Sequence, residues 1–347
     1  MNFLEIVKPD DWHVHFREGE LLKLLVPETS KIYNRAIVMP NLIKPIETVE
    51  NAISYKEEIL KYSNNNPKFE PLMTIYLNEN VNINELKNGF KNKNIFAAKL
   101  YPAGATTNSS KGVKEIEKIY PILEKMSEIK MPLLIHGEVN DKSVDVFDRE
   151  KVFVENILEK ICDYFPELKI TLEHVTTKFS VNYIRSKKSN LKGSITPHHL
   201  ILNRTDMLEH KIKPHYYCLP ILKKEEDRKS LLQMAINGDT NFFLGTDSAP
   251  HNITDKENEC GCAGVFNTIH SLEILTQIFD DNQKLHNLEK FVSLNGSKHY
   301  SLEKNKEKVT LKKMSEPIKF QKSLQSKNHK IKVFKPPFDI YWNIFND

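Results

Sequence analysis

The 347-residue sequence has few cysteines and no long hydrophobic run. Four cysteines do not make a disulfide framework in a chain of this length. Cys260 and Cys262 form an isolated C-x-C without a second Cys or His pair nearby, so we do not expect a zinc knuckle. The leucine-rich stretch LLKLLV is far too short to cross a bilayer, and the first residues lack the basic start and apolar run of a signal peptide. We therefore expect a cytoplasmic protein without a membrane partner.

Arginine clusters and interleaved aromatics are missing from the lysine-rich segment 304–335, which carries much of the basic excess behind a net charge of +4. Such a segment is typical of a solvated surface, and we expect no nucleic-acid partner. Hydrophobic residues at 39% and charged residues at 28% are ordinary for a soluble globular protein. The length suits either two average domains or one large α/β barrel.

Short apolar segments rich in β-branched residues recur along the chain and predict strands. There are eight: LEIVKPDDWHVHF, RAIVMPN, PLMTIYL, AAKLYP, PLLIHGE, KITLEHV, KGSITPHHL and FFLGTDSAPH. Most are separated by segments whose apolar residues recur three and four positions apart, as in helices: IETVENAISYKEEIL, VKEIEKIYPILEKM, REKVFVENILEKICDYF and KEEDRKSLLQMAI. Strand and helix in alternation predict a parallel sheet, either closed into a barrel or open and doubly wound.

Polar residues at the ends of these segments favour the closed form. They are His13 and His15, then Asn41, Lys99, His136, His174, and finally Asp247 with His251. In a (β/α)8 barrel all such ends meet at one face, where the active sites of that fold are built, whereas the first and last strands of an open sheet normally lie far apart. We therefore predict an α/β protein with a (β/α)8 TIM barrel and a few additional strands, in preference to a doubly wound sheet.

Lys99 is a charged residue in the otherwise apolar segment AAKLYP. Lysine is almost never fully buried without a partner, so one interpretation is that Lys99 ends its strand and extends to water. The other is that it belongs to a site. Next to a cation its amine would be pushed towards the neutral form, and a neutral amine can add carbon dioxide to become a carbamate, whose two oxygens can bridge two metal ions.

The H-x-H of His13 and His15 places two imidazoles on the same side of a strand, where they can bind one ion. Histidines two apart also occur by chance, so the motif alone is weak evidence. His136, His174 and Asp247 each end an apolar segment in the same way. Imidazole and carboxylate ligands together suit a divalent ion such as zinc, and an incomplete set of protein ligands leaves a position for reactive water.

In combination these motifs resemble the dihydroorotases of the amidohydrolase superfamily, of the shorter, single-domain type. The similarity runs from Asp10 to about Asn295. It includes DDWHVHFRE (10–18), VMPNL (38–42), AAKLYPAGATTNS (97–109), IHGEV (135–139), LEHVTT (172–177), ITPHHL (195–200), KPHYYCLPILK (213–223), LGTDSAPH (244–251) and CGCAGVFN (260–267). We expect residues 1–347 to form a single barrel domain, with a divergent C-terminal extension from about 296–347.

The resemblance implies a zinc-dependent cyclic amidohydrolase with two zinc ions. His13, His15 and Asp247 would hold one zinc and His136 and His174 the other, with carboxylated Lys99 and a hydroxide bridging them. The implied reaction is the reversible closure of N-carbamoyl-L-aspartate to L-dihydroorotate plus water, a step of pyrimidine synthesis. Asp247 would take the proton of the attacking hydroxide and deliver it to the departing ring nitrogen.

The resemblance also implies the residues that bind the substrate and a homodimeric state. Arg17, Asn41 and His251 would hold the substrate carboxylate, because a guanidinium grips a carboxylate with two parallel hydrogen bonds. Thr106 and Thr107 would reach the ligand from a lid in AGATTNSSKG, which composition alone describes only as a flexible loop. The remaining implied contacts are His136, Leu219 and Ala263. We assign His198, His199 and His215 roles outside the metal site.

Three other functions fit parts of the sequence. A related amidohydrolase acting on another cyclic amide, such as a hydantoin, would have the same metals but different carboxylate-binding residues. A mononuclear deaminase of the superfamily would not need Lys99. A catalytically dead homologue could serve as a scaffold for another pyrimidine enzyme, although such proteins typically lose ligands and this sequence retains all six.

Overall fold

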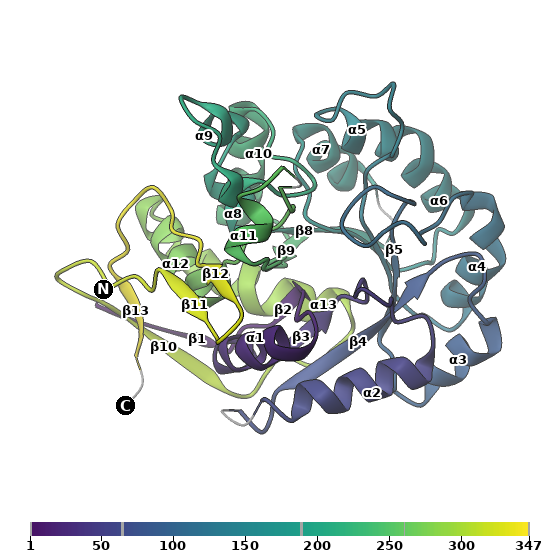
Figure 1. Cartoon of the computed structure of the whole chain (residues 1–347), viewed down its shortest axis with the longest axis horizontal. Helices are drawn as coiled ribbons and strands as arrows, with labels where there is room; N and C mark the ends of the chain where they lie inside the picture. Colours follow the sequence, from purple (N-terminus) through teal and green to yellow (C-terminus); the bar gives the residue numbers. More distant parts are fainter. Residues whose placement is uncertain (1, 64–65, 188–189, 260, 346–347) are drawn as a thin grey trace.

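The computed structural model describes residues 2–63, 66–187, 190–259 and 261–345, and its centre is an eight-stranded parallel sheet (Figure 1). Neighbours along the chain are neighbours in the sheet, as successive β-α units require. The strands are β2 (Asp11–Val14), β3 (Arg35–Val38), β4 (Glu70–Leu77), β5 (Ala97–Leu100), β6 (Leu133–Ile135), β7 (Ile170–Leu172), β8 (Leu191–Ile195) and β9 (Phe242–Leu244).

The sheet closes where β2 meets the residues that follow β9. Val14 and Ser248 form a parallel bridge. The backbone N–H of His15 donates to Ser248 O over 3.1 Å, and that of Asp247 donates to His13 O over 2.9 Å. The predicted (β/α)8 barrel is therefore confirmed, and its closure places the H-x-H motif beside Asp247.

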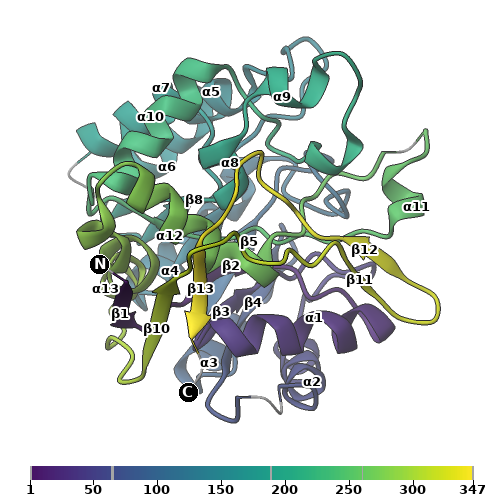
Figure 2. The same cartoon turned by 90° about the vertical axis from the view of Figure 1, so that its left-hand side faces the viewer.

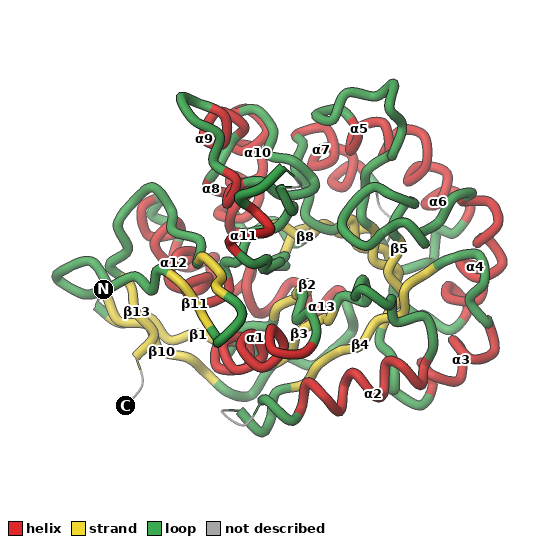
Figure 3. Tube along the Cα trace, viewed as in Figure 1, coloured by secondary structure: helices red, strands yellow, loops and turns green. Residues whose placement is uncertain are grey.

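Helices surround the strands, as the tube in Figure 3 shows with helices in red outside strands in yellow. Threonine side chains cap the amino ends of several helices; Thr48, for example, accepts a hydrogen bond from Asn51 N. No helix in the described ranges combines the length and apolarity needed to cross a membrane. The helices are α1 (Gly19–Ile32), α2 (Val49–Leu60), α3 (Ile83–Lys91), α4 (Tyr120–Glu128), α5 (Arg149–Phe153), α6 (Glu159–Tyr164), α7 (Lys178–Ser186), α8 (Pro197–Ile201), α9 (Arg204–Leu208), α10 (Glu225–Ile236), α11 (Ile253–Lys256), α12 (Ser271–Asp281) and α13 (Asn295–His299).

Two apolar layers hold the barrel together. The outer layer packs the strands against the helices, and the inner layer is a separate buried cluster that includes Trp12, Ile37, Leu134 and Phe243. The inner cluster fills the barrel below the strand ends, so the interior is a packed core and the open space lies at the carboxyl ends.

Five further strands lie outside the barrel (Figures 1 and 2). β1 (Phe3–Val7) pairs antiparallel with β10 (Lys308–Lys313), which pairs with β13 (Trp342–Phe345), while β11 (Ser323–Gln325) and β12 (Lys330–Lys332) form a hairpin. The expectation of one strand over LEIVKPDDWHVHF was wrong, because Phe3–Val7 pairs with a strand about 300 residues away rather than continuing into the barrel. The predicted additional strands are present.

Candidate active site

His13, His15 and Asp247 bring three potential ligand atoms together at the barrel closure. His15 Nε2 lies 3.2 Å from His13 Nε2 and 3.1 Å from Asp247 Oδ1, and His13 Nε2 lies 3.2 Å from the same oxygen. Tetrahedral ligands about 2.1 Å from a zinc ion lie roughly 3.4 Å apart, so this triangle has the size and the donor types of one metal-ion site. All three side chains are buried.

A second pair of imidazoles lies at the ends of β6 and β7. His136 Nδ1 is 3.2 Å from His174 Nε2, a similar spacing. The other ring nitrogen of His136 lies 3.0 Å from Glu138 Oε2, which fixes the orientation of the ring and leaves Nδ1 free for a ligand role. The rings of His174 and His13 are 5.2 Å apart, so the two groups of ligands share one site.

Lys99 is fully buried near the end of β5, two residues after Ala97 of the inner cluster. Its Nζ contacts Glu173 Oε2 and lies 4.8 Å from the centre of the Tyr101 ring. The interpretation that Lys99 extends to water is therefore wrong. Burial lowers the pKa of Lys99, while the Glu173 carboxylate opposes that shift.

Glu173 is a central residue of the site that the sequence analysis missed. One oxygen contacts Lys99, and the other lies 3.0 Å from His13 Nδ1 at ion-pair distance. Burial raises the pKa of Glu173, but His13 and Lys99 outweigh burial and leave the pKa below its usual value. The sequence did contain a signal for Glu173. Its carboxylate stands in an apolar strand segment, just as the ammonium of Lys99 does.

The electrostatics of the first ligand group follow from burial and mutual contact. Burial alone would raise the pKa of Asp247, but His13 and His15 hold it well below 3.8. Burial also opposes the charged form of His13, yet Glu173 and Asp247 raise its pKa to about 9. His15, with less carboxylate contact, has a pKa lowered by burial to about 3. The group thus presents an ionised carboxylate at neutral pH.

Three of the predicted ligand and substrate-binding residues have positive backbone φ angles, which non-glycine residues rarely adopt. These are Arg17 at 58°, His174 at 42° and Asp247 at 44°. Strain of this kind costs on the order of 1–3 kcal/mol per residue and is kept only where the surrounding structure enforces it. Its presence at two candidate metal ligands and at the candidate carboxylate-binding arginine is typical of a functional site.

Arg17 and His251 form a polar pair beside the ligands. Arg17 Nη2 lies 3.1 Å from His251 Nε2, and Arg17 Nε donates to Pro250 O over 3.1 Å. Burial and the Arg17 charge lower the pKa of His251 to about 2, so this imidazole is neutral. The Tyr55 hydroxyl donates to Arg17 O over 2.6 Å, which fixes the backbone of the arginine.

The loop carrying Thr106 and Thr107 lies over the site. Asn41 Nδ2 donates to Thr107 O over 3.0 Å, and Asn108 Nδ2 donates to Asn41 O over 3.1 Å. Asn41 is itself buried. The loop therefore contacts one of the predicted carboxylate-binding residues and lines the cleft.

A cleft of about 360 Å³ joins most of the predicted residues. Two predicted residues do not line the cleft: Lys99 is fully buried, and His251 contacts Arg17 but lines the neighbouring groove. Tyr101, Ala249 and Gly264 also line the cleft and were not predicted. The predicted lining residues are His13, His15, Arg17, Asn41, Thr106, Thr107, His136, His174, Leu219, Asp247 and Ala263.

The remaining histidines lie outside the two ligand groups. His198 and His199 are buried beside Cys218, and both ring nitrogens of His199 are engaged, Nδ1 with Thr196 Oγ1 at 2.8 Å and Nε2 with Pro220 O at 3.1 Å. His215 lies 2.8 Å from Glu257. Cys162 and Cys218 are free thiols, and Cys260 of the C-x-C lies outside the described residues.

Comparisons with known proteins agree with this geometry. The profile of the Amidohydrolase family matches residues 7–338. Dihydroorotases from Sinorhizobium medicae and Agrobacterium fabrum are 48% and 47% identical over 344 residues, which cover 99% of this chain and 99% and 100% of theirs.

Solved structures give the same relationship. The dihydroorotase of Campylobacter jejuni has a TM-score of 0.90 at 36% identity, covering 99% of this chain and 98% of that one. The dihydroorotase of Saccharomyces cerevisiae, in complex with 5-fluoroorotic acid, has a TM-score of 0.91 at 31% identity and 99% coverage of both. An L-hydantoinase from Arthrobacter aurescens shares the fold, with a TM-score of 0.80 and 98% coverage of this chain and 83% of its own, but only 16% of the sequence. The chain therefore belongs to the amidohydrolase family and, within it, to the dihydroorotases.

Proposed function

We propose that this protein is a metal-dependent dihydroorotase that interconverts N-carbamoyl-L-aspartate and L-dihydroorotate plus water in pyrimidine synthesis. The observation that carries the proposal is the contact between Arg17 and His251, 3.1 Å apart, beside the triangle of His13, His15 and Asp247. A carboxylate-binding pair next to a metal site suits a cyclic amide that carries a carboxylate.

The chain's donors fit two zinc ions. His13, His15 and Asp247 would hold one, and His136 and His174 the other, with Lys99 as an N6-carboxylated lysine between them. Lys99 suits this modification because it is buried and its pKa is lowered, which favours the neutral amine that reacts with carbon dioxide. Bound zinc supplies polarisation of a carbonyl oxygen and a lowered pKa for water.

The chain's own residues then orient the substrate and move protons. Arg17, Asn41 and His251 hold the substrate carboxylate, and the loop with Thr106 and Thr107 covers the cleft and excludes water. Asp247 in its ionised form accepts a proton at Oδ for ring opening, and in its protonated form it donates that proton for ring closure. Backbone groups at Leu219 and Ala263 contact the ring.

Two further features belong to the proposal. The enzyme acts as a homodimer in the cytoplasm on a small-molecule substrate. The rival reading as a hydantoinase is weakened by the 15–16% identity to hydantoinases of known structure, against 31–48% to dihydroorotases. The scaffold reading is weakened because all six candidate ligands are present and close together.

The test is an assay of purified protein against carbamoyl aspartate, dihydroorotate and a panel of cyclic amides including hydantoin, before and after chelation, with zinc measured per chain. The proposal expects turnover of the first two compounds, about two zinc ions per chain, and loss of activity with the metal. Turnover of hydantoin alone would reassign the substrate. Activity that survives complete removal of metal would overturn the mechanism.

A further inference from the structure

Lys256 is a second buried lysine close to the cleft, at the carboxyl end of α11. Its exposed fraction is 4%. An ammonium has three N–H donors, and each of the three finds a backbone carbonyl: Nζ donates to Gly264 O over 2.6 Å, to Cys262 O over 2.8 Å and to Tyr217 O over 3.2 Å.

These three carbonyls belong to two neighbouring segments of the cleft wall. Cys262 and Gly264 flank Ala263, and Tyr217 lies two residues before Leu219; Ala263 and Leu219 both line the cleft. The segments also touch directly, because Gly264 N donates to Tyr217 O over 2.9 Å. Lys256 therefore ties together the two backbone stretches that the proposed function assigns to contacts with the ring.

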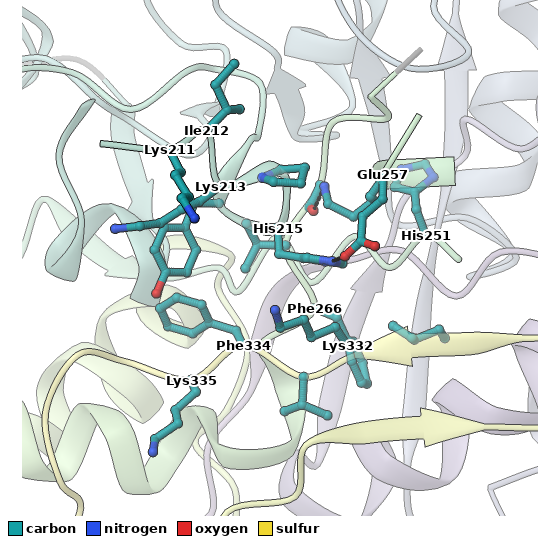
Figure 4. Close-up of a pocket in the computed structure, with 17 residues that line it drawn as sticks. Lys211, Ile212, Lys213, His215, His251, Glu257, Phe266, Lys332, Phe334 and Lys335 are labelled. Atoms are coloured by element: carbon teal, nitrogen blue, oxygen red, sulfur yellow. Dashed lines mark hydrogen bonds and ion pairs between the residues drawn. The ribbon is translucent and has the colours of Figure 1, made fainter. Parts of the chain in front are cut away.

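The wall at this point is thin. On its other side lies a groove of about 1,070 Å³, shown in Figure 4, which His215, Phe266 and Phe334 help to line. Lys256 and Gly264 line this groove, and Gly264 also lines the cleft. Because Gly264 lines open space on both sides, the hydrogen bonds of its backbone help to fix the position of the wall.

Gly264 cannot relax into the space on either side. A Cβ added there would meet Ala249 O at 2.2 Å and the His251 ring at 3.0 Å. Ala249 N in turn donates to Val265 O over 2.9 Å. The segment is thus held between Ala249, in the stretch that follows β9, and the Lys256 ammonium, so removing the ammonium frees only one side.

The charge of Lys256 is costly for the fold. No carboxylate of the described residues lies within ion-pair distance of Nζ, so carbonyl dipoles alone stabilise the ammonium. Burial lowers the pKa of Lys256 to about 8, which leaves the ammonium predominant at neutral pH. If Lys256 only filled space, an apolar side chain of similar length would do so without the free-energy cost of burying a charge.

We propose that Lys256 is a positioning residue for substrate recognition, which holds the backbone around Leu219 and the backbone around Ala263 in fixed register in the cleft wall. The inference rests on the proposed function, since it assigns the ring contacts to these segments. It predicts that Lys256 governs substrate affinity and leaves the metal site and the chemical step largely untouched.

The first experiment compares Lys256→Met with a matched control, Lys223→Met. Lys223 is equally buried at 4% exposure, and its Nζ donates to the single carbonyl of Ile221 over 2.8 Å. Because hydrogen bonds from a charged donor are lost on a wall of the cleft, K256M should raise KM for carbamoyl aspartate and dihydroorotate by about tenfold or more, with kcat changed far less and zinc content as in the wild type. K223M should leave KM at the wild-type value.

Lys256→Gln, which keeps a polar donor, replaces K256M in the experiment if K256M does not fold. Its KM should lie between those of the wild type and K256M. Wild-type KM in every folded Lys256 variant, or an equal rise in K223M, would overturn the proposal. Hydrogen exchange provides a readout independent of activity: the amide of Gly264 should exchange faster in the Lys256 variants than in the wild type or K223M. If wild-type protein does not turn over carbamoyl aspartate, the proposed function fails, while the exchange result still decides whether Lys256 holds the wall.

Discussion

Glu173 Oε1 lies 3.0 Å from His13 Nδ1, so a carboxylate at the end of β7 contacts a candidate ligand carried by β2 on another part of the barrel. The other oxygen of Glu173 contacts Lys99, and the next residue is His174. One side chain thus contacts two of the six candidate ligands, and the residue that follows it is a third. Carboxylates behind metal-binding histidines fix the ring orientation and raise ligand basicity.

Glu173→Gln should weaken zinc binding by about 10–100-fold, because the amide removes the negative charge opposite His13 and Lys99. Competition with a chelator of known affinity measures this change. Glu57→Gln, on the exposed face of α2, is the control and should bind zinc as the wild type does. Unchanged zinc affinity in E173Q would show that Glu173 does not support the ligands.

Asp247→Asn should lower kcat by about 10³-fold in both directions, since the amide can neither accept nor deliver the proton. The pKa of Asp247 is held well below 3.8 in the metal-free chain, so the ionised form that opens the ring prevails at neutral pH. In the wild type, ring closure should therefore slow as pH rises, and ring opening should slow as pH falls, with one shared apparent pKa. A ring-closure rate that is flat with pH would contradict Asp247 as the proton carrier.

Arg17→Met should raise KM for carbamoyl aspartate by roughly 10–100-fold, because hydrogen bonds to a charged carboxylate contribute about 1.5–3 kcal/mol. The neighbouring His251 is neutral and cannot replace the lost charge. Steady-state kinetics measures the effect, and Arg185→Met, whose guanidinium pairs with Asp239 on the surface, is the control. An unchanged KM in R17M would place the carboxylate elsewhere.

The metal-free protein should lose stability on acidification. His15, His199 and His251 have pKa values lowered to about 3, 4 and 2, so they stay neutral in the fold while the unfolded chain takes up protons near pH 6.5. Each such group removes about 1.4 kcal/mol per pH unit below that value, so the three together remove about 4 kcal/mol between pH 7.5 and 5.5. His13, whose pKa is raised to about 9, opposes this loss, because it is protonated in the fold throughout this range while the unfolded chain takes up its proton. It returns about 1.4 kcal/mol, which leaves a net loss of about 3 kcal/mol from these four groups.

Urea unfolding of chelator-treated protein at the two pH values checks this prediction. His210→Gln is the control, because the His210 side chain is 87% exposed and the variant should show the same loss as the wild type. Stability that is equal at both pH values would mean that the buried histidines are not kept neutral by the fold.

The sequence alone was sufficient to predict the barrel and to place the candidate ligands at its strand ends. Apolar segments that end in His, Lys or Asp mark the carboxyl ends of parallel strands, and closure then brings His13 next to Asp247. Helical periodicity likewise predicted the segments that form α2 and α10. These features depend on local patterns and on one topological rule.

Long-range pairing and backbone-carbonyl contacts could not be read in the same way. Phe3–Val7 looks like the start of a barrel strand, and only its pairing with Lys308–Lys313 shows that it belongs to another sheet. Lys256 ends a short helix in a polar stretch of sequence, and nothing in its neighbours reveals that its ammonium donates to three backbone carbonyls, one of them 39 residues away. Glu173 could have been predicted as a site residue, because it is a charged residue in an apolar strand segment, as Lys99 is.

In the proposed site Lys99 would be carboxylated and would join two metal ions at the strand ends. The most direct test is ¹³C NMR of protein loaded with zinc in the presence of ¹³C-labelled bicarbonate, alongside Lys99→Arg as the control. We expect a carbamate resonance in the wild type that is absent from K99R, together with two zinc ions per wild-type chain. An active wild-type protein with no carbamate resonance would contradict it.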